Sequence, residues 1–502
     1  MTRSGLNLIM VLLCAGLGSL LAHAQSESTL PLDRSAVVKN FIPHRNAIRQ
    51  VQPADAVSDE GEISVIPGFS GSAYGVGATI TPTSTEPEDE EHIAVDPNNF
   101  NNLVAMISDF SLNGGFNTSK FAVSTNNGKS WTEGFVPLGS TGFPVTSDGH
   151  IWEANSAPVV TFDKLGNVYL ANLYLNVVGI SVTNDGFYVC SATMASGPTF
   201  SSSDCHPVRT TLKPSFNVED KVWIAADNSD SQFSGTIYAS WSHFEGGADA
   251  IFFSRSLDHG VTWSKAIQIN PDKQDGAVQG SQVAVGPGGQ VYVAYELFFV
   301  GSSGQHYIAR STNGGASFSA AVPMTPVFNN LSFSATYGER SYPALAVSPV
   351  KGKGIIYDVY TDQPSHNART AMVHSKSSAN LTFTAPVSVN DATAGQRLMP
   401  AVAVDAHGVV HTSWFDTRNS GTATDRLDIY ATYSKDNGTT FAPNARLTTV
   451  QVHAGIATFL GTYSGIAAAF NGASSQAHPV WTSGAFGGST NPQMQTTTLT
   501  VP

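Results

Sequence analysis

The sequence predicts an all-β protein that folds as a β-propeller of four-stranded blades. Three observations lead to this prediction. One eight-residue stretch recurs four times along the 502 residues, runs of β-branched and aromatic residues at strand length alternate with Gly- and Asp-rich turns, and helical periodicity is almost absent. A four-stranded unit repeated along a whole chain is typical of a propeller, whose closed ring leaves no long sheet edge exposed.

The repeating unit has the same parts in the same order each time. An apolar strand opens it and often ends in Asp or Gly, a second strand carries aromatic residues, and a third leads into the eight-residue stretch. The openings are HIAVDP, APVVTFD, VWIAAD, SQVAVGP, PALAVSP, PAVAVD and GIAAAF. These seven openings favour seven blades, with six as the alternative. A strand within residues 62–74 is expected to complete the last blade.

Each copy of the eight-residue stretch, which we call the octet, reads Ser-x-Asp/Asn-x-Gly-x-x-Trp/Phe. The copies are Ser124–Trp131, Ser256–Trp263, Ser311–Phe318 and Ser434–Phe441. An Asp or Asn side chain can bond main-chain N–H groups within a turn and Gly permits a positive φ, so we expect a hairpin turn. The alternative makes Asp258 and Asp436 catalytic groups or calcium ligands. It is disfavoured because Asn replaces Asp in two copies and a calcium loop needs further oxygens at fixed spacing.

The N-terminus has the features of a secretory signal peptide. A positive start (MTRSG), an apolar core (LNLIMVLLCAGLGSLL) and the cleavage pattern AHA precede Gln25. We therefore expect cleavage after Ala24, a secreted or periplasmic protein, and no membrane insertion afterwards. Residues 25–75 are expected to form an extended segment that contributes one closing strand, and residues 76–502 form the propeller.

The charge balance excludes some partners. Removing Arg3 with the signal peptide takes Lys and Arg from 25 to 24 against 38 Asp and Glu, a net charge of −14. Nucleic acids and anionic membranes need a basic surface, so neither is expected as the partner. No H-E-x-x-H or C-x-x-C pattern occurs among the His and Cys residues, so no metal and no cofactor are expected. Cys190 and Cys205 remain after cleavage and are expected to form a disulfide.

The four octets resemble the Asp-box, or BNR, repeats of the sialidase superfamily, and the resemblance spans Glu90 to Val501. It implies a carbohydrate-active propeller whose active site lies at the mouth opposite the octets. In that family Asp-boxes also occur in other glycosidases, in lyases and in non-enzymatic propellers, so the motif implies the fold more strongly than the reaction.

Loops that enter each inner strand and leave each second strand meet at that mouth, and they supply the candidate site. By resemblance, Tyr463 is the nucleophile, Glu339 its activating neighbour and Asp109 the acid/base. Asp416 is a possible partner of Glu339 in a carboxylate pair. The expected substrate-binding residues are the arginines of a guanidinium cluster and two sugar-stacking tryptophans: Arg340, Arg397, Arg418, Trp152 and Trp223.

One departure from the family concerns the sugar's charge. The N-terminal Phe/Tyr-Arg-Ile-Pro motif of sialidases is absent, and the corresponding strand begins EEHIAVDP. Glu90 and Glu91 would repel an anionic sugar there. We expect a secreted, monomeric glycoside hydrolase of exo-sialidase-like type that acts on a glycan or glycoconjugate. The alternative is a non-catalytic propeller that binds glycan or protein at the cell surface.

Overall fold

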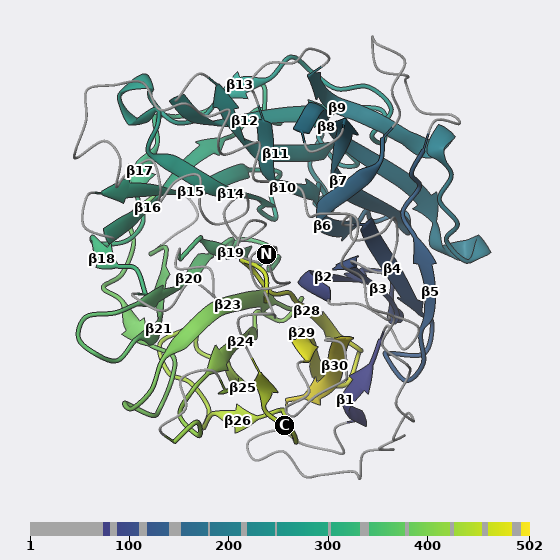
Figure 1. Cartoon of the computed structure of the whole chain (residues 1–502). Helices are drawn as coiled ribbons and strands as arrows, with labels where there is room; N and C mark the ends of the chain where they lie inside the picture. The colour runs from purple at the N-terminus through teal and green to yellow at the C-terminus, as the bar shows by residue number, and fades with distance from the viewer. Residues whose placement is uncertain are drawn as a thin grey trace.

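The computed structural model is a ring of seven β-sheets around a central axis (Figure 1). The structure describes residues 74–80, 88–109, 118–139, 152–178, 181–211, 218–245, 248–299, 303–331, 341–376, 381–421, 426–453, 460–483 and 493–501. Each sheet is antiparallel, and in six of the seven its first strand in the chain lies next to the axis; in the seventh, β28 does. The predicted all-β propeller is confirmed, with seven blades rather than six.

The strands of the first four blades are given from the axis outward. Blade 1 contains β2 (Glu88–Asp96), β3 (Asn99–Asp109), β4 (Thr118–Ser124) and β5 (Thr132–Phe135). Blade 2 contains β6 (Ala154–Phe162), β7 (Asn167–Val178), β8 (Ser181–Thr193) and β9 (Cys205–Thr211). Blade 3 contains β10 (Val218–Ala226), β11 (Ile237–Glu245), β12 (Ala248–Ser256) and β13 (Ile267–Gln268). Blade 4 contains β14 (Val278–Val285), β15 (Val291–Phe299), β16 (Ser303–Ser311), β17 (Val322–Pro323) and the short β18 (Phe328–Asn329).

The remaining blades follow the same order. Blade 5 contains β19 (Ala344–Val347), β20 (Ile356–Asp362), β21 (Arg369–His374) and β22 (Val387–Ser388). Blade 6 contains β23 (Arg397–Val404), β24 (Val410–Asp416), β25 (Arg426–Ser434), β26 (Ala445–Arg446) and the short β27 (Val452–His453). Blade 7 contains β28 (Ile466–Phe470), β29 (Ser475–Ser483), β30 (Gln493–Thr500) and β1 (Tyr74–Thr79). Three 3₁₀ turns are described: η2 (Met194–Ser196), η3 (Ser202–Asp204) and η4 (Asp272–Gln274). No helix among the described residues is long and apolar enough to cross a membrane.

The two ends of the chain meet in blade 7. Strand β1 pairs antiparallel with β30, so the outermost strand of the last blade comes from the N-terminal side of the chain. The sequence placed this strand within residues 62–74, but it begins at Tyr74. Residues 1–73, which include the expected signal peptide, lie outside the described residues. The pairing of β1 with β30 joins the first and last described strands of the chain in one blade and so closes the ring.

Five inner strands carry a β-bulge at the same register among the described residues. In each, two residues oppose one residue of the second strand. The first bulged residue has a positive φ, as in the bulge that normally favours glycine. These residues are Glu90 (58°), Ala157 (51°), Lys221 (49°), Gly280 (70°) and Met399 (47°). Only one of the five is glycine, so the ring holds four other residues in a strained backbone conformation.

The octets are hairpin turns that begin on the last residue of a third strand. In the copy of blade 3, the Ser256 hydroxyl donates to Asp258 Oδ1 at 2.8 Å and accepts from Gly260 N–H at 2.8 Å. Asp258 Oδ1 also accepts from Thr262 N–H at 2.8 Å. In blade 1, Asn126 accepts the same main-chain bond from Ser130 at 2.9 Å. The amide thus replaces the carboxylate without loss of the turn.

Each octet also contacts the blade before it. Gly260 packs against Tyr169 and Val189 of blade 2. A Cβ added to Gly260 would lie at ordinary van der Waals distance from both side chains. At the ring closure, Asn127 Nδ2 of blade 1 donates to Gln476 Oε1 of blade 7 at 3.2 Å. The octets therefore join neighbouring blades on one face of the propeller. The C-terminal end of each inner strand lies on this same face, because the third strand runs parallel to the first.

Cys190 and Cys205 form a disulfide between β8 and β9. Both residues are buried in the core between blades 1 and 2. The bond therefore fixes the outermost strand of blade 2 across the 15-residue separation of the two cysteines.

The octet geometry predicts different effects for two substitutions at one position. Asp258→Asn should change stability by less than about 0.5 kcal/mol at pH 7, because Asn makes the equivalent bonds in two other copies. Asp258→Ala should cost about 1–2 kcal/mol, because Thr262 N–H and Ser256 lose their acceptor. Urea unfolding measures both. Equal losses for Asn and Ala would show that the carboxylate charge, and not the turn bonds, supplies the stability.

Candidate functional site

A cavity of about 550 Å³, its mouth included, lies on the propeller axis. Its wall is built mainly from inner-strand residues at and just after the bulges, which places it on the octet side of the bulge ring. The sequence placed the site at the opposite mouth, many of whose loops lie outside the described residues. The cavity lining includes His92, Trp223, Gln282, Tyr342, Thr462 and Tyr463.

One wall of the cavity is aromatic. The rings of His92 and Trp223 meet edge to face with centroids 4.9 Å apart. Tyr463 follows at 5.8 Å from Trp223, and its hydroxyl donates to the Pro158 carbonyl oxygen at 3.1 Å. Burial lowers the pKa of His92 to about 4, so this ring is neutral at physiological pH. The wall therefore combines apolar ring surface with a neutral imidazole.

A charged cluster lies directly behind the wall. Lys221 Nζ is 3.5 Å from Glu90 Oε1 and 3.6 Å from Asp220 Oδ1. Thr462 donates to Glu90 Oε1 at 3.1 Å. Gln279 Nε2 donates to Asp220 Oδ2 at 3.0 Å, and Gln279 Oε1 accepts from the Tyr342 hydroxyl at 2.9 Å. Thr462 and Tyr342 thus connect the cavity to two carboxyl groups that are only 1% and 4% exposed.

Neighbouring blades supply the space for this cluster. Tyr342 of blade 5 lies against Gly280 of blade 4, where a Cβ would come within 2.0 Å of the Tyr342 ring. The ring centroid of Tyr342 is 6.0 Å from Lys221 Nζ. A side chain at position 280 would therefore displace the tyrosine from both the cavity wall and the ammonium group.

The acidity of Asp220 is shifted by its surroundings. Burial raises the pKa of the Asp220 carboxyl to about 6, the Lys221 ammonium lowers it in part, and the Glu90 carboxylate raises it. A carboxyl group with this pKa can exchange a proton near neutral pH, which an ordinary exposed Asp cannot do.

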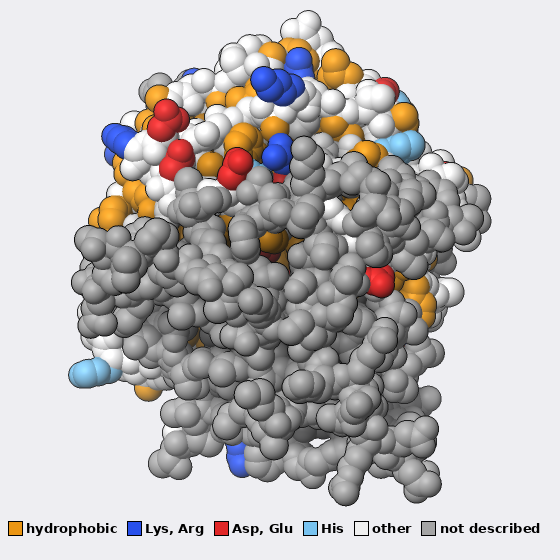
Figure 2. Space-filling view, turned by 45° about the horizontal axis from the view of Figure 1, so that its top comes forward, with side chains coloured by type: hydrophobic (Ala, Val, Ile, Leu, Met, Phe, Trp, Pro, Cys, Tyr) orange, Lys and Arg blue, Asp and Glu red, His pale blue; other side chains and the backbone are white. Residues whose placement is uncertain are grey.

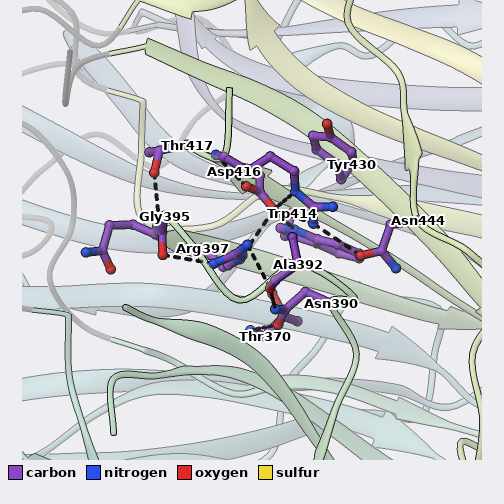
Figure 3. Close-up of polar contacts among 12 residues, drawn as sticks. Thr370, Asn390, Ala392, Gly395, Arg397, Trp414, Asp416, Thr417, Tyr430 and Asn444 are labelled. Atoms are coloured by element: carbon purple, nitrogen blue, oxygen red, sulfur yellow. Dashed lines mark hydrogen bonds and ion pairs between the residues drawn. The ribbon is translucent and has the colours of Figure 1, made fainter. Parts of the chain in front are cut away.

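Two arginines of the predicted guanidinium cluster, Arg397 and Arg418, lie together on Asp416, and their side chains already donate to other groups of the protein (Figure 3). Arg397 is fully buried and donates to Asp416 Oδ2 at 3.2 Å. It also donates to the carbonyl oxygens of Ala368, Gly395 and Ala392 at 2.8–3.2 Å. Arg397 therefore fixes the loop before β23, and it does not line the described cavity.

Arg418 is committed in the same way. Its Nε and Nη2 donate to Asp416 Oδ2 at 3.0 and 2.7 Å, Nη1 donates to Asp391 Oδ1 at 2.7 Å, and its guanidinium stacks on Tyr430 at 3.9 Å. Asp416 is itself fully buried and also accepts from Trp414 Nε1 at 2.9 Å. In this arrangement Asp416 holds two arginines together and is not exposed to a ligand.

The other candidates fall in different places. Asp109 is fully buried and pairs with Lys120 at 2.7 Å inside blade 1. Trp152 is 1% exposed and packs on Tyr174 and Tyr188, so this conformation does not offer its face to a sugar. Glu339 and Arg340 lie outside the described residues. Of the predicted residues that the structure describes, Trp223 and Tyr463 come together at the cavity.

The sequence did not single out the carboxyl–ammonium cluster as a site. Its members come from two blades, and Lys221 reads locally as one polar residue in a strand. The available signal was the repeat itself, since Glu90, Lys221 and Gly280 occupy the same position in three copies of the repeat. No group of His, Cys, Asp and Glu suited to hold a metal occurs in the described part of the chain.

The surface gives little indication of a polyanionic partner. In the upper part of Figure 2, where most of the coloured residues lie, basic and acidic side chains occur among uncharged ones. The described part of this face therefore offers no extended basic surface.

The raised pKa of Asp220 predicts a pH-dependent gain in stability for Asp220→Asn. Its folded pKa of about 6 lies above the unfolded value, so the stability it contributes is present below about pH 4 and lost as the pH rises through 6. At pH 7.5 the variant should be more stable than the parent by up to about 3 kcal/mol, and the two should converge near pH 4. Urea unfolding across this range tests it, with the exposed Asp272→Asn as control. A difference that does not change with pH would contradict the assignment.

Replacement of Arg397 should weaken the fold rather than a binding site. Arg397→Met leaves three carbonyl oxygens without their donor and reduces the compensation of buried Asp416, a loss of about 3–5 kcal/mol. Arg369→Met, which removes a partly exposed ion pair with Asp362, should cost less than about 1 kcal/mol. Chemical unfolding of both variants measures the difference. A stable Arg397→Met protein that no longer binds glycan would restore the predicted substrate role.

Neither a protein-family model nor a curated protein matches the sequence. Solved structures with a similar chain course include a protein of unknown function from Dyadobacter fermentans, at 15% identity and a TM-score of 0.46 over 87% of this chain and 100% of that one. They also include the Hadza microbial sialidase Hz136, at 14% and 0.41 over 76% and 73%. A third is the Penicillium chrysogenum α-L-arabinanase in complex with arabinobiose, at 13% and 0.44 over 86% and 98%. Likeness at this level decides nothing about activity, and the propeller assignment rests on the strand pairing of this chain.

Proposed function

We propose that the protein is a carbohydrate-active propeller that takes part of a glycan into its central cavity. The observation that carries the proposal is the wall formed by His92, Trp223 and Tyr463 on the propeller axis. A pyranose ring presents C–H faces that pack on aromatic rings, while its rim of hydroxyl groups needs hydrogen-bond partners.

The rest of the cavity suits such a ligand. Small-molecule sites combine apolar surface with a few placed polar groups, and the lining of this cavity contains both kinds of side chain. Gln282, Thr462 and Ser464 supply amide and hydroxyl groups among the lining residues. Gln282 Oε1 accepts from Leu345 N–H at 2.8 Å, so its amide is held in place by the next blade.

A second candidate is hydrolysis of the bound glycan, and the carboxyl pair favours it. One carboxyl oxygen of Glu90 and one of Asp220 each lie within 3.6 Å of Lys221 Nζ. The two oxygens are therefore closer to each other than the upper limit of roughly 9.5 Å for paired carboxyl groups in glycosidases. With a pKa of about 6, Asp220 could donate a proton. Both groups are almost fully buried behind Thr462 and Tyr342, which favours binding over hydrolysis in the conformation described.

The sialidase-like reaction expected from the sequence remains a separate form of this second candidate. It uses Tyr463 as nucleophile with Glu339, and the position of Tyr463 at the cavity supports it. Export through residues 1–24, a monomeric state and the identity of the octets as Asp-boxes also remain parts of the proposal.

Removal of one ring from the aromatic wall should weaken glycan binding. In a panel of oligosaccharides and polysaccharides tested by calorimetry, the full chain should bind at least one member, and Trp223→Ala should weaken that binding tenfold or more, about 1.4 kcal/mol. Trp223→Phe should retain part of it. Trp131→Ala is the matched control, because Trp131 is a half-buried octet residue outside the cavity.

Release of reducing ends in the same panel separates the two candidates. Turnover that is lost in Asp220→Asn would favour hydrolysis by the carboxyl pair, whereas loss in Tyr463→Phe and Glu339→Gln would favour the sialidase-like route. Binding without turnover would leave a glycan-binding propeller. No binding to any member, or equal losses in the Trp223 and Trp131 variants, would overturn the proposed function.

A further inference from the structure

We propose that the central cavity selects uncharged saccharides and rejects those that carry a carboxylate or a sulfate. This inference rests on the proposed function, because it names the class of glycan that the cavity accepts. It is carried by the distribution of charge around the cavity and by the partners of the nearby arginines.

The groups behind the cavity wall carry an excess of negative charge. Glu90 and Asp220 face a single compensating ammonium group, that of Lys221. Glu90 is one side chain away from the cavity, through Thr462, and Asp220 is two side chains away, through Gln279 and Tyr342. Because both carboxyl groups are almost fully buried, their charges are weakly screened, so an anion in the cavity is repelled.

Lys221 does not offset this repulsion. Its ammonium nitrogen lies within 3.6 Å of both carboxyl groups and beside the ring of Tyr342. An anion that approached from the cavity would compete with two fixed carboxylates for the same cation. The ammonium group therefore neutralises part of the cluster and is not presented to the ligand.

No described residue of the cavity lining is an arginine or a lysine. Recognition of a sugar carboxylate normally uses a bidentate guanidinium. Arg397 and Arg418, which the sequence offered for this role, are bound to Asp416, Asp391 and main-chain carbonyl oxygens. An anionic sugar would thus lose its hydration in the cavity without gaining a cationic partner.

The selectivity should also depend on pH. The charged groups that face Asp220 are Lys221 beside it and Glu90 of blade 1, and the neutral Gln279 donates to it from blade 4. Asp220 Oδ1 accepts from the main-chain N–H of Lys221 at 2.7 Å, so a proton bound by Asp220 is best placed on Oδ2. The Gln279 amide would then turn so that its oxygen accepts from this proton. Protonation removes one of the two negative charges, and discrimination against anions should then decrease.

The test uses matched oligosaccharide probes that end in glucose or galactose, or in glucuronic or galacturonic acid. The full chain should bind the neutral member of a pair at least tenfold more tightly than the anionic member at pH 7.5. The ratio should fall threefold or more at pH 5, where the uronic acids are still ionised. Asp220→Asn should show the smaller ratio at both pH values.

The control and the contrary outcomes are distinct from those of the proposed function. Asp272→Asn removes an exposed carboxyl outside the cavity and should keep the parent ratio. Equal or tighter binding of the uronic acid probes would overturn the inference while leaving glycan binding intact. A ratio unchanged in Asp220→Asn, in a protein shown by circular dichroism to be folded, would also overturn it. Failure of all probes to bind would instead count against the proposed function.

Discussion

The geometry of the site depends on one constraint, the bulge that the inner strands carry at a common register. Two inner-strand residues oppose one residue of the second strand, and the first of the two takes a positive φ. This conformation bends the strand next to the axis and redirects one side chain from each of the five bulged strands. Because these bulges fall at the same level, residues far apart in sequence meet there. Glu90 and Lys221 therefore form an ion pair, although they belong to different sheets.

The same constraint explains the division between the two faces of the inner ring. On one side of the bulges lie the ends at which the chain enters the inner strands. On the other side the inner strands continue to short turns, and the octets of four blades join each of these blades to the one before it. A left-handed residue is costly unless its surroundings hold it in place. At the bulges, four non-glycine residues adopt this left-handed conformation. The closed ring and its octet contacts must therefore hold them in place.

Much of the fold could be predicted from the sequence because its signals are local. An octet encodes its own turn through Ser, Asp or Asn and Gly within eight residues, and apolar runs at strand length recur around it. The closing strand was misplaced because residues 62–79 contain several short apolar runs, and only pairing with β30 distinguishes among them. The site was less predictable. Arg397 entered the prediction by its place before an inner strand, but the direction of its side chain is set by Asp416 and three carbonyl oxygens. Trp152 was likewise expected to stack on a sugar because it is aromatic, but its side chain is packed among core residues.

The carboxyl cluster finally bears on why the axis is not simply filled with apolar side chains. A raised pKa means that the folded state holds the ionised Asp220 at a cost, and Asn or an apolar residue at this position would avoid that cost. A buried ion pair is rarely more stabilising than well-packed apolar residues of similar size. Stability alone therefore gives no reason to keep Glu90, Asp220 and Lys221 together at the bulges. Groups held at such a cost beside an aromatic cavity are what a binding site requires when it must distinguish ligands by charge. The strained backbone and the unfavourable carboxyl group thus point to the same place on the axis.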